Sequence, residues 1–253
     1  SSDVIHSFRR HDSLYVYCRK CRSYRLDPLP DRTALHQAYA AYYPHEGPLL
    51  PKTDLHAKVL DAIERSRPDK GVLLDVGAGY GELANLALGR GWKTWALESL
   101  PHCADYIERT WRIPVVRAMI EDADLEPASF DAVTMIDVLD QLQNPRHALE
   151  RVASILAPGG VVFVRVRNGA VHAGALKLYQ AFLGSSRIKG WLPIINVWGL
   201  SSTSLNLLCR LCGLSPIRLL NGPWVGVSSY GGGIPVALLK NAAFYGAETI
   251  RSG

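Results

Sequence analysis

The sequence predicts an α/β fold in which a mostly parallel sheet of about seven strands has helices on both faces. From residue 71 onward, short apolar runs alternate with helical patterns, which is typical of parallel strands connected by helices. The first apolar run leads into a glycine-rich turn and then a helical pattern, an arrangement that exposes backbone N–H groups to a ligand. Two further runs near the C-terminus can close the sheet as an antiparallel pair.

Residues 1–51 precede this alternation, and we expect them to form a separate N-terminal unit. Leu14–Tyr17 alternates in hydropathy like a strand and leads into Cys18-Arg-Lys-Cys21, which predicts a hairpin that carries a cysteine pair. The prolines of Asp27-Pro-Leu-Pro30-Asp then break the chain, and a capping helix begins near Thr33. Residues 52–253 form the main domain in this prediction.

The main domain begins with a helix at Thr53–Arg65. The apolar runs predict strands at Val72–Val76, Lys93–Leu97, Val115–Val116, Ala132–Ile136 and Val161–Val166. Helices are expected near Tyr80–Gly89, Cys103–Arg109, Arg146–Leu156 and Ser202–Gly213, and the closing strands at Pro216–Leu220 and Pro235–Lys240. Residues 167–200 interrupt the alternation. They predict an insertion over the carboxyl ends of the fourth and fifth strands, where such sheets bind ligands.

The composition is that of an ordinary globular protein, with 48% hydrophobic residues, 20% charged residues and a net charge of +5. No apolar run approaches the ~18 residues that span a bilayer, no secretory signal is visible, and the five cysteines form no disulfide-like array, so we expect a cytoplasmic protein. No dense basic run predicts a nucleic-acid partner. Nothing in the sequence predicts the oligomeric state.

The glycine turn favours a cationic ligand over a dinucleotide. Gly77-Ala78-Gly79-Tyr80-Gly81 has one residue before its last glycine, whereas the dinucleotide fingerprint has two. Asp75 ends the preceding strand, where a carboxylate is expected to repel a pyrophosphate and attract an ammonium or sulfonium. S-adenosylmethionine carries both cations and no phosphate. A turn without a ligand and a NAD-dependent oxidoreductase are the alternatives, because Glu98 suits the ribose of either cofactor.

Three motifs follow one another along the chain: LLDVGAGYGELA, then ALES, then MIEDADLEPASFDAVTMIDVLDQLQNPRHALERVASILAPGGVVFVRVRN. This series resembles the class I S-adenosylmethionine-dependent methyltransferases, most closely their small-molecule group, over about residues 52–220. The resemblance implies a Rossmann-like class I methyltransferase fold, S-adenosylmethionine as cofactor and a small-molecule methyl acceptor. A module that binds S-adenosylmethionine without catalysis, in a regulatory role, is the alternative.

The resemblance also implies which residues bind the cofactor. In that family the glycine loop wraps the methionine part of S-adenosylmethionine, and the acid at the position of Glu98 binds the ribose. The segment at Ile120-Glu121-Asp122 flanks the adenine, and Asp137 lies near the methionine amine. The implied cofactor-binding residues are Asp75, Gly77, Ala78, Gly79, Gly81, Glu98, Ser99, Ile120, Glu121 and Asp137.

The general base is the feature that the resemblance leaves open. Many relatives have Leu-Glu-His after the fourth strand, but this chain has Leu139-Asp140-Gln141. A glutamine forms hydrogen bonds but does not take up a proton, so a histidine base is lost at this position. Of the other histidines and tyrosines, the candidates that we favour are His172 in the insertion and the two tyrosines that end the capping helix, Tyr42 and Tyr43.

The N-terminal segment resembles a zinc-ribbon remnant that precedes the domain in some relatives. A C-x-x-C turn directs two thiolates at one ion, but a structural zinc site needs four ligands. His6 and His11 are near enough in sequence to supply the other two. Relatives often have an earlier cysteine pair, which is absent from this sequence, and we therefore expect Cys18 and Cys21 to bind no metal.

Overall fold

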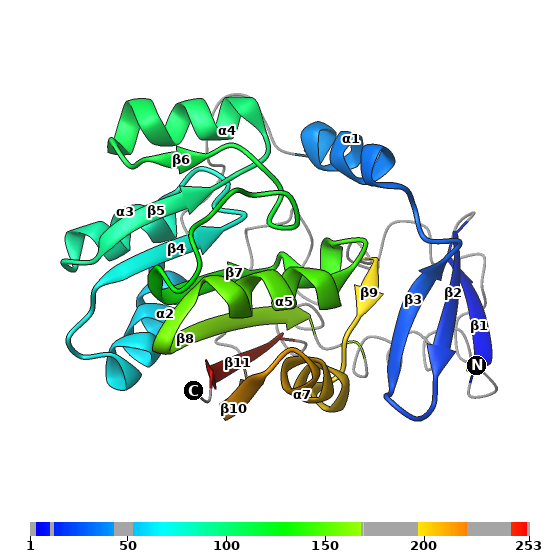
Figure 1. The fold of residues 1–253 in the computed structure, drawn as a ribbon. Helices are drawn as coiled ribbons and strands as arrows, with labels where there is room; N and C mark the ends of the chain where they lie inside the picture. Colours follow the sequence, from blue (N-terminus) through cyan, green and yellow to red (C-terminus); the bar gives the residue numbers. More distant parts are fainter. Residues whose placement is uncertain are drawn as a thin grey trace.

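The computed structural model describes residues 4–10, 13–42, 53–167, 169, 197–221 and 244–251. In these residues seven strands form the main sheet, in the order β10-β11-β8-β7-β4-β5-β6 (Figure 1). Their bounds are β4 (Val72–Val76), β5 (Lys93–Leu97), β6 (Val115–Val116), β7 (Phe130–Ile136), β8 (Leu156–Arg167), β10 (Leu214–Asn221) and β11 (Phe244–Arg251).

The central part of this sheet is parallel. Strands β6, β5, β4, β7 and β8 pair in parallel, whereas β11 pairs antiparallel with both β8 and β10. The predicted parallel sheet is therefore confirmed. The order of connection reverses at β4, which lies between β5 and β7, and this switch point is where open α/β sheets bind ligands at their carboxyl ends.

The closing pair of strands differs from the prediction. We expected Pro216–Leu220 to pair with Pro235–Lys240, but β10 pairs with β11, which begins at Phe244; residues 235–240 lie outside the described part of the chain. The expectation rested on hydrophobicity alone. The sequence of β11, FYGAETIR, is less apolar but contains aromatic and β-branched residues, which favour a paired strand.

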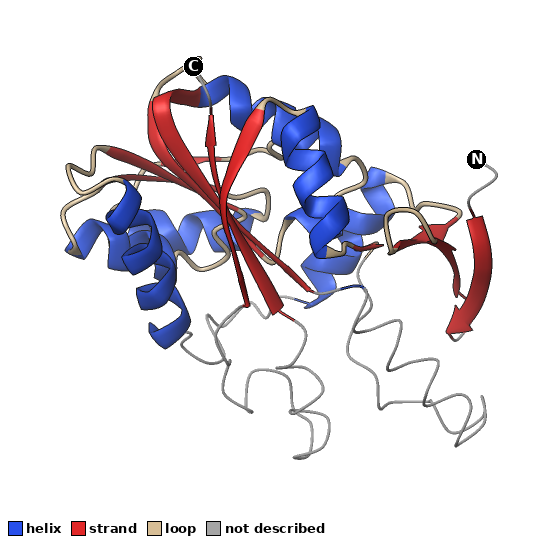
Figure 2. Cartoon of the chain, turned by 90° about the horizontal axis from the view of Figure 1, so that it is seen from below, coloured by secondary structure: helices blue, strands red, loops and turns tan. Residues whose placement is uncertain are grey.

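Helices cover both faces of the sheet (Figure 2). One face packs against α2 (Thr53–Ser66) and α3 (Glu82–Gly89), and the other packs against α5 (Pro145–Ile155) and α7 (Ser202–Leu211). The period of two along each strand assigns side chains to the faces. On β8, for example, Val161 and Phe163 belong to the α2 side and Val162 and Val164 to the α5 side.

Local signals in the sequence mark where two of these helices, α5 and α7, begin. The Asn144 side chain accepts a hydrogen bond from the His147 amide at 3.1 Å, and Pro145 occupies the first turn of α5. A capping box of Ser201 and Ser204 starts α7. The remaining short helices are α4 (Pro101–Tyr106), a π-helical turn η1 (Ile107–Trp111) and a 3-10 turn η2 (Leu139–Gln141).

The N-terminal unit is a second, small sheet. Strands β1 (Val4–Arg10), β2 (Ser13–Cys18) and β3 (Ser23–Asp27) are antiparallel, and the β2–β3 turn carries the cysteine pair. The fourth strand, β9 (Trp198–Gly199), comes from the end of the predicted insertion. The end of the insertion thus adds a strand to the hairpin sheet. From this sheet, α1 (Arg32–Tyr42) extends toward the main sheet (Figure 1).

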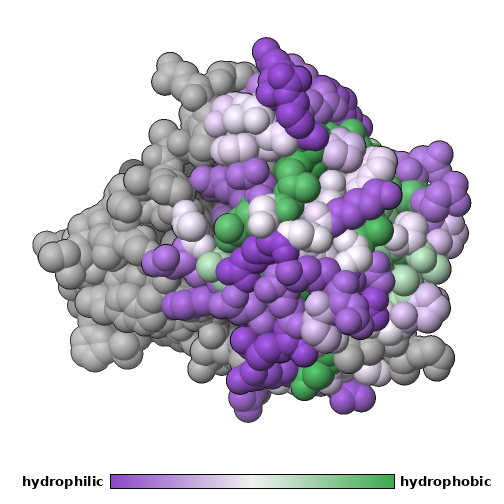
Figure 3. Space-filling view, turned by 90° about the vertical axis from the view of Figure 1, so that its left-hand side faces the viewer, coloured by the Kyte–Doolittle hydropathy of each residue, from purple (hydrophilic) through white to green (hydrophobic). Residues whose placement is uncertain are grey.

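The described surface is mostly hydrophilic on the side of α3 and β5 (Figure 3). Hydrophobic residues interrupt the polar surface there only in small groups. None of the helices in the described segments combines the length and apolar character needed to cross a membrane.

Candidate active site

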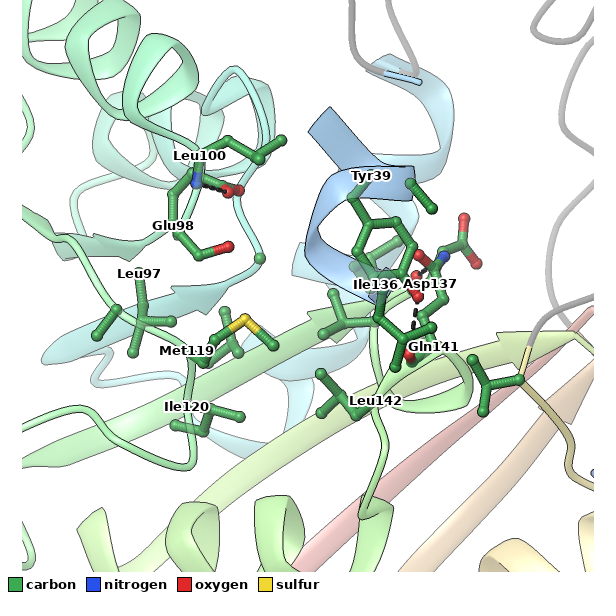
Figure 4. A pocket seen from close by; sticks show the side chains of 18 of the residues that line it. Tyr39, Leu97, Glu98, Leu100, Met119, Ile120, Ile136, Asp137, Gln141 and Leu142 are labelled. Atoms are coloured by element: carbon green, nitrogen blue, oxygen red, sulfur yellow. Dashed lines mark hydrogen bonds between the residues drawn. The ribbon is translucent and has the colours of Figure 1, made fainter. Parts of the chain in front are cut away.

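A cavity of about 420 Å³ lies at the carboxyl ends of β4, β5, β7 and β8, whose last residues all contribute to its wall. The N-terminal unit closes it from the other side with Leu26, Pro30, Ala34, Leu35, Ala38 and Tyr39. Figure 4 shows Glu98 and Leu100 at one end of the cavity, and Tyr39, Asp137 and Gln141 at the other. Met119 and Ile120 lie below Glu98 in this view, and Leu142 lies nearer to Gln141.

The structure brings half of the predicted cofactor residues to this cavity. Gly77, Glu98, Ser99, Ile120 and Asp137 line it. The other five are absent from the described wall: Asp75, Ala78, Gly79, Gly81 and Glu121. Residues at the tips of strands β4, β5 and β7 thus line the cavity, and Gly77 is the residue of the glycine loop that belongs to its described wall.

Glu98 connects the cavity to the glycine loop. Its side chain is buried, with Oε2 accepting a hydrogen bond from the Gly79 amide and Oε1 accepting one from the Leu100 amide, both at 2.8 Å. Burial raises the pKa of Glu98, although backbone amides such as those of Leu100 and Gly79 act to lower it. The carboxylate is therefore held in one orientation at the end of β5.

Each glycine of the loop has a left-handed backbone that residues with a side chain rarely adopt: φ is 66° at Gly77, 56° at Gly79 and 76° at Gly81. The amides of Gly77 and Ala78 donate to the Leu97 carbonyl at 2.8 and 3.2 Å, which fixes the loop on β5. A Cβ at Gly77 would lie 2.5 Å from Cγ2 of Val138. The close packing of these elements therefore also requires glycine.

Asp75 does not face the cavity, in contrast to the expectation from sequence. Its side chain is 4% exposed, and Oδ1 accepts a hydrogen bond from the Thr134 hydroxyl at 2.6 Å. Asp75 shares the α2 side of the sheet with Leu73 because the two residues are two apart on β4. The argument that this carboxylate selects a cationic ligand was therefore wrong about where the side chain points.

Asp75 makes stability depend on pH. Burial raises its pKa from 3.8 to about 7, although the Thr134 hydrogen bond acts to lower it. Because the pKa of Asp75 is higher in the folded than in the unfolded protein, its protonated form stabilises the fold at low pH. This contribution is lost as pH rises from about 4, the unfolded pKa, through about 7, the folded pKa. We expect Asp75→Asn, which cannot ionise, to gain a few degrees in melting temperature relative to wild type between pH 5 and pH 8.

Thermal unfolding of both proteins at the two pH values measures this difference. Asp124→Asn, at an exposed position, is the control and should show no such change. An Asp75→Asn protein whose melting temperature differs from wild type by the same amount at both pH values would contradict the prediction.

Asp137 adopts an unusual conformation at the end of β7. Its φ is 60°, a left-handed value that aspartate tolerates better than most residues. Its amide donates to the Arg165 carbonyl at 2.9 Å, and the Gln141 side-chain amide donates to its carbonyl. Its Oδ2 lies 2.6 Å from Nη1 of Arg165, which is 1% exposed. These contacts fix the carboxylate at the cavity wall.

Tyr39 is the aromatic residue of the described cavity wall, and the sequence argument did not select it. Its hydroxyl donates to the Gln141 carbonyl at 2.7 Å, and burial raises the pKa of Tyr39. Leu35, Ala38 and Tyr39 share one face of α1, and this spacing was the available signal. Of the predicted bases, Tyr42 ends α1 without a described side chain, and Tyr43 and His172 lie outside the described residues.

The cysteine pair lies away from this cavity, in the β2–β3 turn. Burial raises the pKa of the Cys21 thiol, and the neighbouring Cys18 acts in the same direction. The described residues contain no group of three or more potential metal ligands, but His11 and the side chain of His6 lie outside them. The expectation that the pair binds no metal stays a prediction.

Comparison with known proteins agrees with this geometry. Residues 51–219 match the family described as "Methyltransferase domain". A ubiquinone biosynthesis O-methyltransferase of Xylella fastidiosa is 27% identical over 188 residues, which are 70% of this chain and 72% of that protein. One from Xanthomonas campestris is 30% identical over 155 residues, 58% of this chain and 63% of that protein.

Solved structures share the fold at low sequence identity. The 1,6-didemethyltoxoflavin-N1-methyltransferase of Burkholderia thailandensis, with bound S-adenosylhomocysteine, has a TM-score of 0.64 at 14% identity and covers 98% of this chain and 100% of its own. A geranyl diphosphate C-methyltransferase from Streptomyces coelicolor has a TM-score of 0.59 at 14% identity and covers 87% of this chain and 100% of its own. The chain therefore belongs to the methyltransferase domain family and is an S-adenosylmethionine-dependent methyltransferase.

Proposed function

We propose that the cavity binds S-adenosylmethionine beside a small-molecule acceptor and that the methyl group is transferred to an acceptor oxygen. The observation that supports this most is the placement of Glu98 and Asp137 at opposite ends of one cavity at the switch point of the sheet. The predicted cofactor residues that line it are Gly77, Glu98, Ser99, Ile120 and Asp137. Asp75, Ala78, Gly79, Gly81 and Glu121 take supporting roles in this proposal.

The charges of the cavity fit this cofactor. Glu98 and Asp137 are the acidic residues of the described wall, and Arg167 is its basic residue. Carboxylates suit ribose hydroxyls and a cationic amino-acid group, whereas a pyrophosphate at Glu98 would meet a buried negative charge. Met119 and Ile120 supply an apolar surface beside Glu98, which suits the adenine ring.

S-adenosylmethionine supplies a methyl group that its sulfonium has already activated, so the protein's main task is alignment. In this proposal Glu98 holds the ribose, and Asp137 receives the methionine amine. Helix α1 covers the cavity, with Tyr39 bonded to the η2 carbonyl of Gln141. The acceptor then lies between α1, η2 and the end of the insertion, where Val197 lines the wall and the Trp198 indole donates to the Leu142 carbonyl at 3.0 Å.

The division of the chain follows from the same proposal. Residues 1–51 form an N-terminal unit that covers the site, and we interpret this unit as a metal-free remnant of a zinc ribbon. Residues 52–253 form the methyltransferase domain, which contains the seven-stranded sheet and the insertion at 167–200. Oxygen as the accepting atom is supported by the relatives, which are named O-methyltransferases. A cytoplasmic location stays a prediction from composition.

Gln141 favours the alternative that this chain binds the cofactor without catalysis, since a glutamine does not act as a base. Two measurements separate the proposals. Calorimetry with S-adenosylmethionine, S-adenosylhomocysteine and NAD should show binding of the first two only. Incubation with methyl-labelled S-adenosylmethionine and small-molecule extracts should then label a low-mass product. Cofactor binding without any labelled product would favour the non-catalytic module, and NAD binding alone would refute both.

A further inference from the structure

A buried arginine lies near the carboxyl end of β8, one of the inner strands of the main sheet. Arg165 follows Val164 and precedes Val166, and both of these neighbours are buried as well. Moving a guanidinium out of water is costly unless the group is paired and hydrogen-bonded. A charged side chain therefore persists at this position only with a partner that compensates for the cost.

That partner is Asp137, which Arg165 contacts at two points. The β7–β8 ladder pairs Ile136 with Arg165, and just beyond this pair the Asp137 amide donates to the Arg165 carbonyl at 2.9 Å. The Arg165 guanidinium reaches the same residue, with Nη1 2.6 Å from Oδ2. Asp137 has a left-handed φ of 60°, a conformation that persists only where surrounding contacts hold it. Arg165 thus holds both the backbone and the carboxylate of Asp137.

Asp137 lies between Arg165 and the cavity. It belongs to the described cavity wall, where Figure 4 places it beside Gln141. Arg165 is not among the described residues of that wall. Arg165 therefore acts on a ligand in the cavity through Asp137 and not by contact.

Stability of the fold gives no reason for this ion pair. Two apolar side chains of similar volume in place of a buried ion pair are often neutral or stabilising. A carboxylate at the cavity wall is useful to a cationic ligand, and a cation fixed behind a buried carboxylate favours its ionised form. The arrangement of Arg165, Asp137 and the cavity fits this use.

We propose that Arg165 is a positioning residue for recognition of the cofactor amine, acting through the Asp137 carboxylate. This inference rests on the proposed function, in which Asp137 receives the methionine amine. An ammonium group forms charge-assisted hydrogen bonds with a carboxylate that is ionised and correctly oriented. Arg165 supplies both conditions without occupying the cavity. Its removal should therefore weaken the binding of ligands that carry the amine and leave ligands without the amine nearly unaffected.

The test compares S-adenosylhomocysteine with its desamino analogue, in which hydrogen replaces the α-amino group, by titration calorimetry on the full chain. Wild type should bind S-adenosylhomocysteine about 10–150-fold more tightly than the analogue, the range for a charge-assisted hydrogen bond. In Asp137→Asn and in Arg165→Met this ratio should fall by about 10-fold. Arg165→Lys keeps one charge but loses the planar fork of donors, and should give an intermediate ratio.

Arg67→Met is the matched control for a purely structural loss. Arg67 pairs with Asp131 near the start of β7, at the opposite end of that strand from Asp137, and both side chains of the pair are partly buried. Its removal should lower the melting temperature without changing the ratio of the two affinities. A merely structural role of Arg165 likewise predicts equal losses for the two ligands.

The outcomes separate this inference from the proposed function. Wild-type protein that does not bind S-adenosylhomocysteine would refute the proposed function. If wild type prefers S-adenosylhomocysteine and Asp137→Asn loses the preference, the role of Asp137 stands, and the inference alone fails if Arg165→Met keeps the wild-type ratio or weakens both ligands equally. If Arg165→Met does not fold, Arg165→Lys decides: a wild-type ratio overturns the inference, and a lower ratio with normal binding of the analogue supports it. Equal affinity of wild type for the two ligands would overturn both the amine site and the inference.

Discussion

Replacing Arg165 by methionine is expected to lower the free energy of unfolding by about 3–5 kcal/mol, the usual cost of removing one partner from a buried ion pair. The side chains of Arg165 and Asp137 are 1% and 9% exposed, so water cannot compensate for the lost partner. In a chain of this size the loss corresponds to a melting temperature lower by about 10 °C or more. Denaturant titration and thermal unfolding measure both quantities.

Two further variants identify the cause. Arg165→Met combined with Asp137→Asn removes both charges, and should recover part of the loss in a double-mutant cycle. Arg146→Met breaks an ion pair with Glu150 whose side chains are 59% and 43% exposed, and should cost less than about 1 kcal/mol. If Arg165→Met costs no more than Arg146→Met, the Asp137 carboxylate is not held as the structure indicates.

The elements of the sheet were predictable because their signals are local. Each run that forms β4, β5 and β8 is apolar along most of its length, and Glu98 and Asp137 follow the ends of such runs. Parallel strands place those ends at one edge of the sheet, so both acids were expected at the site. Their position depends on the topology alone, and both line one cavity in the structure.

The orientation of Asp75 was not predictable in the same way. A strand buried on both faces shows no alternation of polar and apolar residues, so its sequence does not reveal which face a side chain takes. Residues on either side of Asp75, Leu74 and Val76, are as buried as Leu73. From the sequence alone, Asp75 is therefore interpreted as a ligand-facing residue. The structure shows instead that its carboxylate accepts a hydrogen bond from the Thr134 hydroxyl on the neighbouring strand.

Arg165 and Tyr39 were missed because their roles depend on distant residues. An arginine in an apolar strand is typical of a solvent-facing edge, and only the placement of Asp137 28 residues earlier makes its burial possible. Tyr39 reaches the Gln141 carbonyl 102 residues away. Strand β9 is two residues long and is recognised as a strand by its pairing with β3 of the N-terminal sheet. Two residues are too few to show the local pattern that distinguishes a strand from a loop.

Glu98→Ala is expected to weaken S-adenosylhomocysteine binding by about 30–150-fold, because it removes charge-assisted hydrogen bonds worth about 2–3 kcal/mol. Calorimetry measures the affinity, and Glu126→Ala, at an exposed position, is the matched control. The variant also leaves the Gly79 and Leu100 amides without the carboxylate that they contact at 2.8 Å. Loss of affinity alone therefore does not distinguish ribose binding from disorder of the glycine loop.

A ligand that lacks the ribose 2′-hydroxyl separates these two causes. If Glu98 binds that hydroxyl, removing the hydroxyl from the ligand and the carboxylate from the protein should be strongly non-additive. The 2′-deoxy ligand should then bind wild type about 10-fold or more weakly, and lose little further affinity in Glu98→Ala. Additive losses would show that Glu98 acts only through the Gly79 and Leu100 amides. An unchanged affinity of Glu98→Ala for S-adenosylhomocysteine would remove Glu98 from the site altogether.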